Sequence, residues 1–464
     1  MGRYGLTGTD FTDTPCHPCF FSYTNAYSMI RNILSIILIS LPLFLAAQKR
    51  IFIPEDMQGM DLDNPESKWS YARSAQTDNL IFFWEKGFGN DLQNPPQLEG
   101  KPMHFDLDNL KSRVESFYHF FRDTLQFSLP GSKAERYKMM VMVNYSLDGT
   151  AYGGTYDNFI GALWVAPNRI QDRKLNCLAH ELGHSFQLQI PADSVGDAWG
   201  GSGFYEMTSQ WMLWQVNPDW VKDEQYHFDA FRNLTHKAYL HMENIYHSPY
   251  VIEWWSELRG KPSIAQLYRE GKKGEDPVMT YKRKYQLSQA DFCDEMFRGY
   301  QHLVNFDFSH ARKETRPYAC TFSTFLNTKG KNKFVIPNLY APENYGFNAI
   351  KLSVPQAGGS VTIQFQGLLN EKGYHYEHPE KAGWRYGFVG VTADDTTIYG
   401  DIHHDMMGKV KFTAPKGQPL KALYFIVMGA PTEHWMNPMP WGDHPEPDAQ
   451  WPYQLTIKGA SVIN

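Results

Sequence analysis

The chain has 464 residues, of which 42% are hydrophobic and 20% charged, and this composition indicates a soluble globular protein of two or three domains. Its formal net charge of -6 gives no basis for binding nucleic acid, so no nucleic-acid partner is expected. The sequence has no internal repeat, phosphate-binding loop or Gly-x-Ser-x-Gly motif. Nucleotide hydrolysis and serine-hydrolase chemistry are therefore not leading functions.

Residues 1–47 differ from the rest of the chain. Met29 and a lone Arg31 precede an apolar run over residues 33–47 that ends in two alanines, which is a signal-peptide pattern. A membrane-spanning helix needs about 20 apolar residues, so an uncleaved anchor is the less favoured alternative. We expect Met29 to be the true start and the mature protein to begin near Gln48. It would be secreted, periplasmic or at the cell surface, with no stable membrane span.

Hydrophobic spacing predicts four elements before residue 166. Nearly continuous apolar runs predict strands over residues 79–85 and 139–145. An apolar stripe at helical spacing predicts a helix over residues 106–127. Glycines at 149, 153 and 154 predict a turn, which is followed by a strand over residues 159–165.

The segment 175–188 is a helix candidate that carries the motif His180-Glu181-x-x-His184. Residues four apart lie on one helix face, so both imidazoles can reach one metal ion, and Glu181 can reach a water molecule on it. A catalytic zinc keeps one position open for water and lowers the pKa of that water to about 7. Gly183 costs the helix about 1 kcal/mol relative to Ala, which indicates a close approach there. The alternative is an amphipathic helix with two surface histidines.

A catalytic zinc needs a third protein ligand, and the best candidate is Glu206. Ser202 resembles an N-cap, and the apolar stripe after it predicts a helix that would bring Glu206 against the histidine pair. The alternative is that Glu206 only favours a helix N-terminus. Asp193 and Asp197, in the intervening loop, are rival ligands.

His180-Glu181-x-x-His184 followed by a helical Glu206 resembles the gluzincin group of zinc metallopeptidases. The resemblance implies that His180, His184 and Glu206 bind Zn²⁺ and that Glu181 is the general base. Thermolysin-like members have Glu-x-x-Ser-Asp on the second helix, whereas this chain has Gln210 at the Asp position, so Gln210 or another group must orient a ligand histidine. More narrowly, the chain resembles secreted bacterial proteins of unknown function with a C-terminal β domain.

The same resemblance implies two further features of the site. The sheet edge beside the motif helix would pair with an extended peptide, which points to residues 159–165; an ordinary core strand is the alternative. A His or Tyr would stabilise the oxyanion. Spacing does not choose among the candidates, which are Tyr205, His227, His236, His241, Tyr246 and His247.

Beyond Glu206 the chain is expected to be helical and then β. Helices are predicted over residues 228–245, 251–258, 264–269 and 286–303, and a polar linker over 328–333. Strands are predicted over 349–354, 360–365, 384–391, 396–399, 409–413, 422–427 and 453–457, a pattern typical of a β-sandwich. Its aromatic residues Trp435, Trp441 and Trp451 could contact a glycan, although a structural spacer is the favoured role. Cys293 and Cys320 could pair in an oxidising compartment.

These observations predict an α+β protein with three parts: a leader over residues 1–47, a zincin-like domain over 48–333 and a β-sandwich over 334–464. The expected function is a secreted zinc metalloendopeptidase acting on a protein or glycoprotein substrate, with Glu181 deprotonating water. The alternatives are a non-catalytic binding or surface protein on a peptidase-like scaffold and a metallohydrolase of another substrate.

Overall fold

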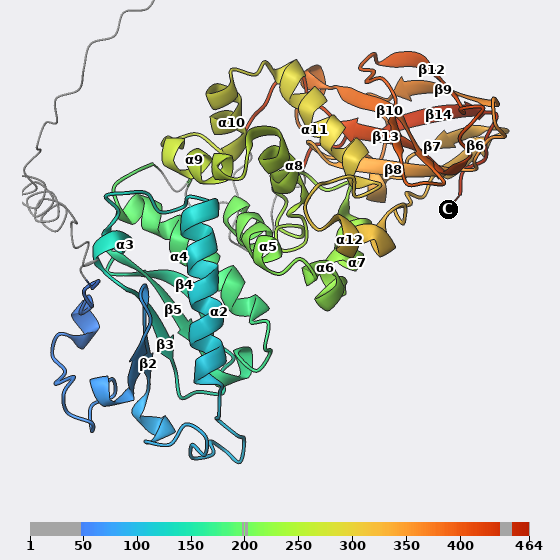
Figure 1. Cartoon of the computed structure of the whole chain (residues 1–464). Helices are drawn as coiled ribbons and strands as arrows, with labels where there is room; N and C mark the ends of the chain where they lie inside the picture. Colours follow the sequence, from blue (N-terminus) through green and yellow to red (C-terminus); the bar gives the residue numbers. More distant parts are fainter. Residues whose placement is uncertain (1–47, 197–198, 200–202, 437–447, 464) are drawn as a thin grey trace, which may run out of the picture. The chain divides into compact units, whose positions relative to one another are not determined.

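A computed structural model describes residues 48–196, 199, 203–436 and 448–463 (Figure 1). The predicted signal segment and start at Met29 lie outside these residues. Residues Lys49–Asn464 form one compact unit. It combines helices with three sheets, so the expected mixed class of helix and strand is confirmed, while the boundary at residues 333/334 stays a prediction. In the described part of the chain, no helix is long and apolar enough to cross a membrane.

The first sheet has five strands in the order β1-β2-β3-β5-β4. The central strands β2, β3 and β5 are parallel, and β1 and β4 run antiparallel to their neighbours. All five residues of β2 and of β3 are buried, as expected for continuous apolar runs. The strands are β1 (Ser74–Gln76), β2 (Leu80–Trp84), β3 (Met139–Val143), β4 (Ala151–Tyr156) and β5 (Ile160–Val165).

Two predictions about this sheet are wrong. Of the glycines expected to form a turn, Gly153 and Gly154 lie in strand β4, whereas Gly149 precedes that strand. Strand β5, which the resemblance placed at the edge, is paired on both sides, with β3 and with β4, so the alternative of an ordinary core strand is confirmed. Within the described residues, β4 is the edge strand beside the motif helix. The strand needs glycine at position 153 because a Cβ there would lie 1.8 Å from the carbonyl oxygen of Glu181.

The motif helix α4 (Asn176–Ala192) packs against β4 and β5 and beside α2 (Leu107–His119), which continues as a π-turn over Phe120–Thr124. Polar side chains of α4 fasten it to the sheet. Ser185 Oγ donates to the Ala162 carbonyl (2.8 Å), and Gln189 Oε1 accepts from Gly161 N–H (2.8 Å). These hydrogen bonds to β5 fix the position of the helix relative to the sheet.

Helices fill the middle of the chain. The predicted helix over 228–245 ends early, at Leu234, because the next backbone groups bond to the β region: Phe347 N–H donates to Thr235 O (2.7 Å) and Tyr239 N–H to Asn344 O (3.0 Å). Helix α10 was not predicted. The helices are α3 (Lys133–Arg136), α5 (Phe204–Val216), α6 (Trp220–Asp223), α7 (Gln225–Leu234), α8 (Tyr250–Arg259), α9 (Pro262–Glu270), α10 (Pro277–Tyr285), α11 (Gln289–Leu303) and α12 (Arg312–Thr315).

Helix α8 supports α5 through a buried carboxylate. Glu253, 1% exposed, accepts hydrogen bonds from Trp211 Nε1 and Gln215 Nε2, both at 2.8 Å. Burial, together with the charge of Glu257, raises the pKa of Glu253 to about 7. The folded state therefore binds a proton more tightly than the unfolded chain. This contribution to stability is complete below the ordinary pKa of 4.5 and is lost as pH rises through 7.

Glu253→Gln is accordingly expected to stabilise the protein in alkaline solution. At pH 8 its free energy of unfolding should exceed that of the parent by up to about 3 kcal/mol, and the difference should vanish near pH 4.5. Denaturant unfolding of both proteins at pH 5 and pH 8 measures it. A difference that is equal at the two pH values would contradict this explanation.

The C-terminal strands form two antiparallel, sandwich-like sheets, with orders β11-β10-β13-β8 and β12-β9-β14-β7-β6. Alternate residues of β13 serve two cores: Leu423 and Phe425 face the second sheet, whereas Tyr424 and Ile426 join the core of the helical region. The strands are β6 (Asn327–Gly330), β7 (Lys333–Val335), β8 (Phe347–Leu352), β9 (Ser360–Gly367), β10 (Trp384–Thr392), β11 (Thr397–Tyr399), β12 (Met407–Thr413), β13 (Leu420–Gly429) and β14 (Tyr453–Lys458).

Three predictions about this half need correction. The polar linker expected over 328–333 contains most of the β6–β7 hairpin, whose β6 side chains are exposed and so lack an apolar pattern. Trp451 cannot contact a glycan, because it is fully buried and its Nε1 donates to Asn344 Oδ1 (2.9 Å); Trp441 lies outside the described residues. Cys293 and Cys320 are both free thiols.

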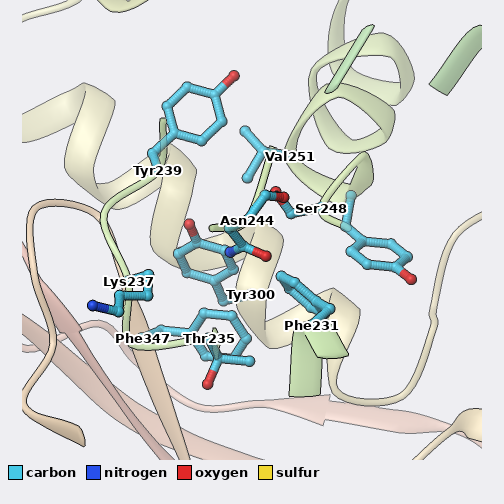
Figure 2. A pocket seen from close by; sticks show the side chains of 10 residues that line it. Phe231, Thr235, Lys237, Tyr239, Asn244, Ser248, Val251, Tyr300 and Phe347 are labelled. Atoms are coloured by element: carbon cyan, nitrogen blue, oxygen red, sulfur yellow. The ribbon is translucent and has the colours of Figure 1, made fainter. Parts of the chain in front are cut away.

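A cavity of about 20 Å³ lies where the segment after α7 meets Tyr300 and Phe347 (Figure 2). Such a volume suits a single water molecule and excludes a substrate. The side chain of Asn244 lines it and offers a polar atom to a water. The cavity therefore belongs to the packing of the chain and is not a binding pocket.

Candidate metal centre

Helices α4 and α5 cross closely at a glycine, and this contact builds the site. A Cβ at Gly183 would lie 2.6 Å from Ser209 Oγ and 3.3 Å from Ser209 Cα, so a larger residue would push α5 away. The close approach predicted from Gly183 is confirmed. It brings the histidines of α4 and the carboxylate of α5 to the same point between the helices.

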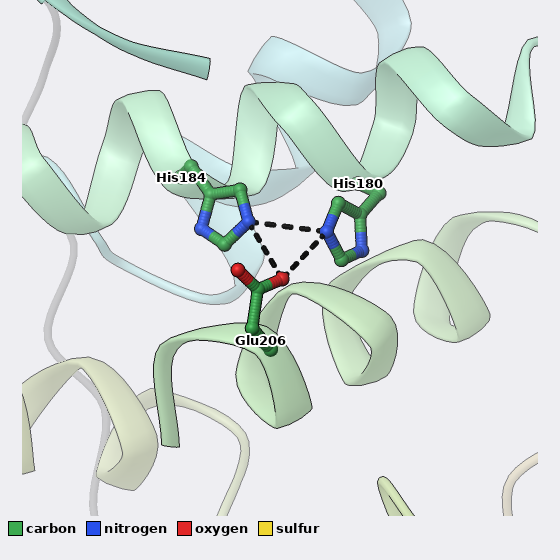
Figure 3. A group of neighbouring side chains, drawn as sticks. All are labelled: His180, His184 and Glu206. Atoms are coloured by element: carbon green, nitrogen blue, oxygen red, sulfur yellow. Dashed lines mark hydrogen bonds and ion pairs between the residues drawn. The ribbon is translucent and has the colours of Figure 1, made fainter. Parts of the chain in front are cut away.

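The three predicted ligands, His180, His184 and Glu206, converge there (Figure 3). Glu206 Oε2 lies 3.1 Å from the Nε2 atoms of His180 and His184, and these two nitrogens are 3.1 Å apart. Tetrahedral zinc with Zn–N bonds of about 2.05 Å would place its ligand atoms about 3.3 Å apart. The side chains are 12%, 12% and 16% exposed, so the site is sheltered but reachable from solvent.

Two glutamines fix which nitrogen of each histidine carries its proton. Gln210 Oε1 lies 3.0 Å from His180 Nδ1, and Gln187 Oε1 lies 3.0 Å from His184 Nδ1. The amide orientations are determined because the other end of each amide faces a backbone carbonyl, that of Tyr246 (2.8 Å) or that of Tyr205 (3.0 Å). Both Nδ1 atoms must therefore donate to a glutamine oxygen, and both Nε2 atoms present lone pairs.

This arrangement suits a cation. With both Nε2 atoms deprotonated and Glu206 ionised, three electron-pair donors face one another at 3.1 Å and cannot hydrogen-bond among themselves. Two imidazoles and one carboxylate form a donor set that zinc accepts, with a position left for water.

Glu181 lies on the same helix and faces the edge strand. Its Oε2 accepts a hydrogen bond from Gly153 N–H of β4 (2.8 Å). Burial raises the pKa of Glu181, which makes its carboxylate a stronger base than an exposed glutamate. A carboxylate beside a metal-type donor set, with one oxygen bound to the backbone of β4, is placed to exchange protons with a water molecule held by that set.

Asp193, one of the two rival ligands, does not join the triad. Asp193 caps the start of α3 through Ser132 Oγ (2.5 Å) and Lys133 N–H (3.0 Å). Asp197 and the predicted N-cap Ser202 lie outside the described residues, and α5 begins at Phe204.

Among the candidates for stabilising an oxyanion, Tyr246 lies beside the triad. Its ring centroid is 6.3 Å from that of His180 and its phenol interacts with Glu206. Burial, with the charge of Glu206, raises the pKa of Tyr246 to about 12, so the phenol keeps its proton at neutral pH. His227 contacts Gln210, and His247 contacts His227, so both are linked to His180 through Gln210. No role is assigned to the remaining candidates, Tyr205, His236 and His241.

A second group, His241, Glu343 and Asp448, also has potential ligand atoms within 4.8 Å of one another. It is less suited to a metal than the first. Lys237 Nζ lies 3.4 Å from Glu343 Oε1 and supplies positive charge, and His241 Nδ1 accepts from Glu243 N–H (3.1 Å), which leaves the ring proton on Nε2. This group is part of the junction between helices and strands.

Fold and site together define a mixed α/β protein with a two-histidine, one-glutamate centre between neighbouring helices. The chain belongs to a family of unknown function, DUF6055, whose profile matches residues 44–464. No curated protein matches the chain.

Proposed function

We propose that the protein is a secreted zinc-dependent metallopeptidase with a zincin-like, gluzincin-type site. The observation that carries the proposal is the convergence of three electron-pair donors at 3.1 Å with Glu181 beside them. The packing of α4 against a mixed sheet, with α5 against α4, supports a zincin-like fold for the first part of the chain. Secretion rests on the apolar run over residues 33–47.

His180, His184 and Glu206 would hold the ion through Nε2, Nε2 and Oε2. When bound, zinc supplies a Lewis acid for a water molecule and for the substrate carbonyl. Glu181 takes a proton from the attacking water on its carboxylate and later delivers it to the leaving amine. Tyr246 donates its phenol hydrogen to the oxyanion that develops on the carbonyl, because its raised pKa keeps that hydrogen in place.

The substrate would be an extended polypeptide paired with the outer edge of β4. That edge has no strand partner among the described residues, and its Gly153 N–H points at Glu181. Pairing a peptide backbone with a free edge needs no particular side chain and places the peptide next to the base. A protein or glycoprotein substrate follows from this, and Trp435 is the partly exposed aromatic left for a glycan contact in the C-terminal part.

Zinc content and proteolysis of the chain from Gln48 onward test the proposal. We expect one zinc per chain by elemental analysis, and cleavage of casein that a chelator abolishes and added zinc restores. A chain without zinc would contradict the metal centre. A chain with zinc that cleaves no peptide would favour a metallohydrolase of another substrate.

A further inference from the structure

Gln210 stands where thermolysin-like peptidases have aspartate, and its surroundings suggest why. We propose that Gln210 is a positioning residue that couples the metal ligand His180 to Tyr246, a task that only an amide can perform at this place. The consequence of this coupling for catalysis rests on the proposed function. The coupling itself is inferred from hydrogen bonds within the chain.

The oxygen of the Gln210 amide serves the ligand. Gln210 is 3% exposed, and its Oε1 accepts from His180 Nδ1 (3.0 Å). This bond holds the imidazole in one orientation, with the Nε2 lone pair aimed at the point between His184 and Glu206. Without an acceptor at Nδ1, the ring could rotate or carry its proton on the nitrogen needed for the metal.

The nitrogen of the same amide holds the segment of Tyr246. Gln210 Nε2 donates to the Tyr246 carbonyl (2.8 Å) and approaches His227 Nε2 (3.3 Å). His227 Nε2 then accepts, so its Nδ1 carries the proton and donates to His247 Nδ1 at 2.6 Å. Glu224 Oε2 is farther from His227 Nε2, at 3.5 Å, and accepts from Trp220 Nε1 (2.9 Å). Gln210 therefore holds Tyr246 directly and the next residue, His247, through His227.

A carboxylate could not replace the amide. Aspartate or glutamate accepts hydrogen bonds but donates none when ionised, so a second oxygen would face the Tyr246 carbonyl without a proton between them. Glutamine both accepts from the ligand and donates to the backbone of the residue across the site. The departure from the thermolysin-like pattern thus matches the need to hold Tyr246.

Gln187 offers a matched comparison. It is fully buried and orients His184 in the same way, with Oε1 at 3.0 Å from Nδ1. Its Nε2, however, donates to the Tyr205 carbonyl (3.0 Å) and lies 3.3 Å from Ser209 Oγ, on the α5 side of the site. Substitutions at the two positions should therefore lower the affinity for zinc to a similar extent, but only those at Gln210 should loosen the backbone around Tyr246.

Zinc affinity and hydrogen exchange test the coupling without any measurement of activity. Gln210→Met and Gln187→Met should each lower the affinity for zinc 10- to 100-fold in a chelator competition, because each removes the hydrogen-bond acceptor of a ligand histidine. Gln210→Glu keeps an acceptor, so its zinc affinity should stay within about threefold of the parent. Exchange of the amides of residues 244–248 should become about tenfold faster in Gln210→Met and Gln210→Glu, and stay unchanged in Gln187→Met.

The outcomes separate this inference from the proposed function. If the parent binds zinc and Gln210→Met binds it equally well, or if Gln187→Met loosens residues 244–248 as much as Gln210→Met, the coupling is overturned and the metal site stands. If the parent binds no zinc, the proposed function fails, and exchange alone decides whether Gln210 holds Tyr246. Circular dichroism checks folding. Should Gln210→Glu fail to fold, the two Met variants still decide both points.

Discussion

Glu181→Gln is expected to keep its zinc and to lose cleavage. Glu181 is not one of the three converging side chains, and its carboxylate accepts a hydrogen bond from Gly153 N–H, so the metal site should form without its charge. A glutamine fills the same space and can still accept that hydrogen bond, but cannot take a proton from water. General-base catalysis contributes about 10²- to 10⁴-fold, and we expect kcat to fall by that factor with KM little changed.

The measurement pairs zinc per chain with the rate of casein cleavage for parent and variant. Glu206→Gln is the matched control, because it is an equally conservative change at a ligand and should lose zinc as well as activity. A Glu181→Gln protein that retains zinc and cleaves casein at the parent rate would remove Glu181 as the base. A Glu181→Gln protein that loses zinc would instead place this carboxylate among the ligands.

The sequence predicts that His180, His184 and Glu206 lie close together because the information is local. His180 and His184 share a face through the helical period, and Glu206 sits on the next helix, whose apolar stripe sets which side faces α4. Gly183 signals the close contact by its cost in a helix. The remaining step, bringing two predicted helices together, needs only a short connection, so few arrangements are possible.

The edge strand could not be predicted in the same way. Gly153 and Gly154 lack the β-branched and aromatic side chains that indicate a strand. Strand β4 forms by pairing with β5, and position 153 is glycine because α4 packs closer than a side chain would permit. Similarly, the helix starting at Gln225 ends at Leu234 because residues more than 100 positions later in the chain take its next backbone hydrogen bonds. Such contacts leave no periodic pattern at the position that they change.

The burial of Trp451 in the C-terminal part is a third feature that the sequence does not predict. Trp451 lies in a polar, proline-rich stretch that predicts exposure, yet it is fully buried and hydrogen-bonded to Asn344.

Gln187 and Gln210 carry no motif of their own, and their role depends on carbonyls of Tyr205 and Tyr246. Hydrogen-bond partners of this kind become visible only when both ends are placed in space.

Gly153→Ala is expected to damage both the sheet edge and the base. A Cβ at this position would lie 1.8 Å from the carbonyl oxygen of Glu181 and 2.6 Å from its carbonyl carbon. These are backbone atoms in the middle of α4, so no side chain can turn aside, and β4 must move away from the helix. Overpacking of this kind costs about 3 kcal/mol of folding free energy. The movement also breaks the hydrogen bond from Gly153 N–H to Glu181.

Denaturant unfolding and casein cleavage, measured on Gly153→Ala and on the neighbouring Gly154→Ala, check this prediction. The Cβ of Gly154→Ala would meet the ring of Tyr152, at 2.9 Å, and this side chain is 58% exposed and free to shift. Gly154→Ala should therefore lose less than about 1 kcal/mol and keep most of its activity. Because β4 would carry the substrate, Gly153→Ala should lose activity even at temperatures where it stays folded and holds zinc. Equal behaviour of the two variants would mean that the contact between β4 and Glu181 does not govern the site.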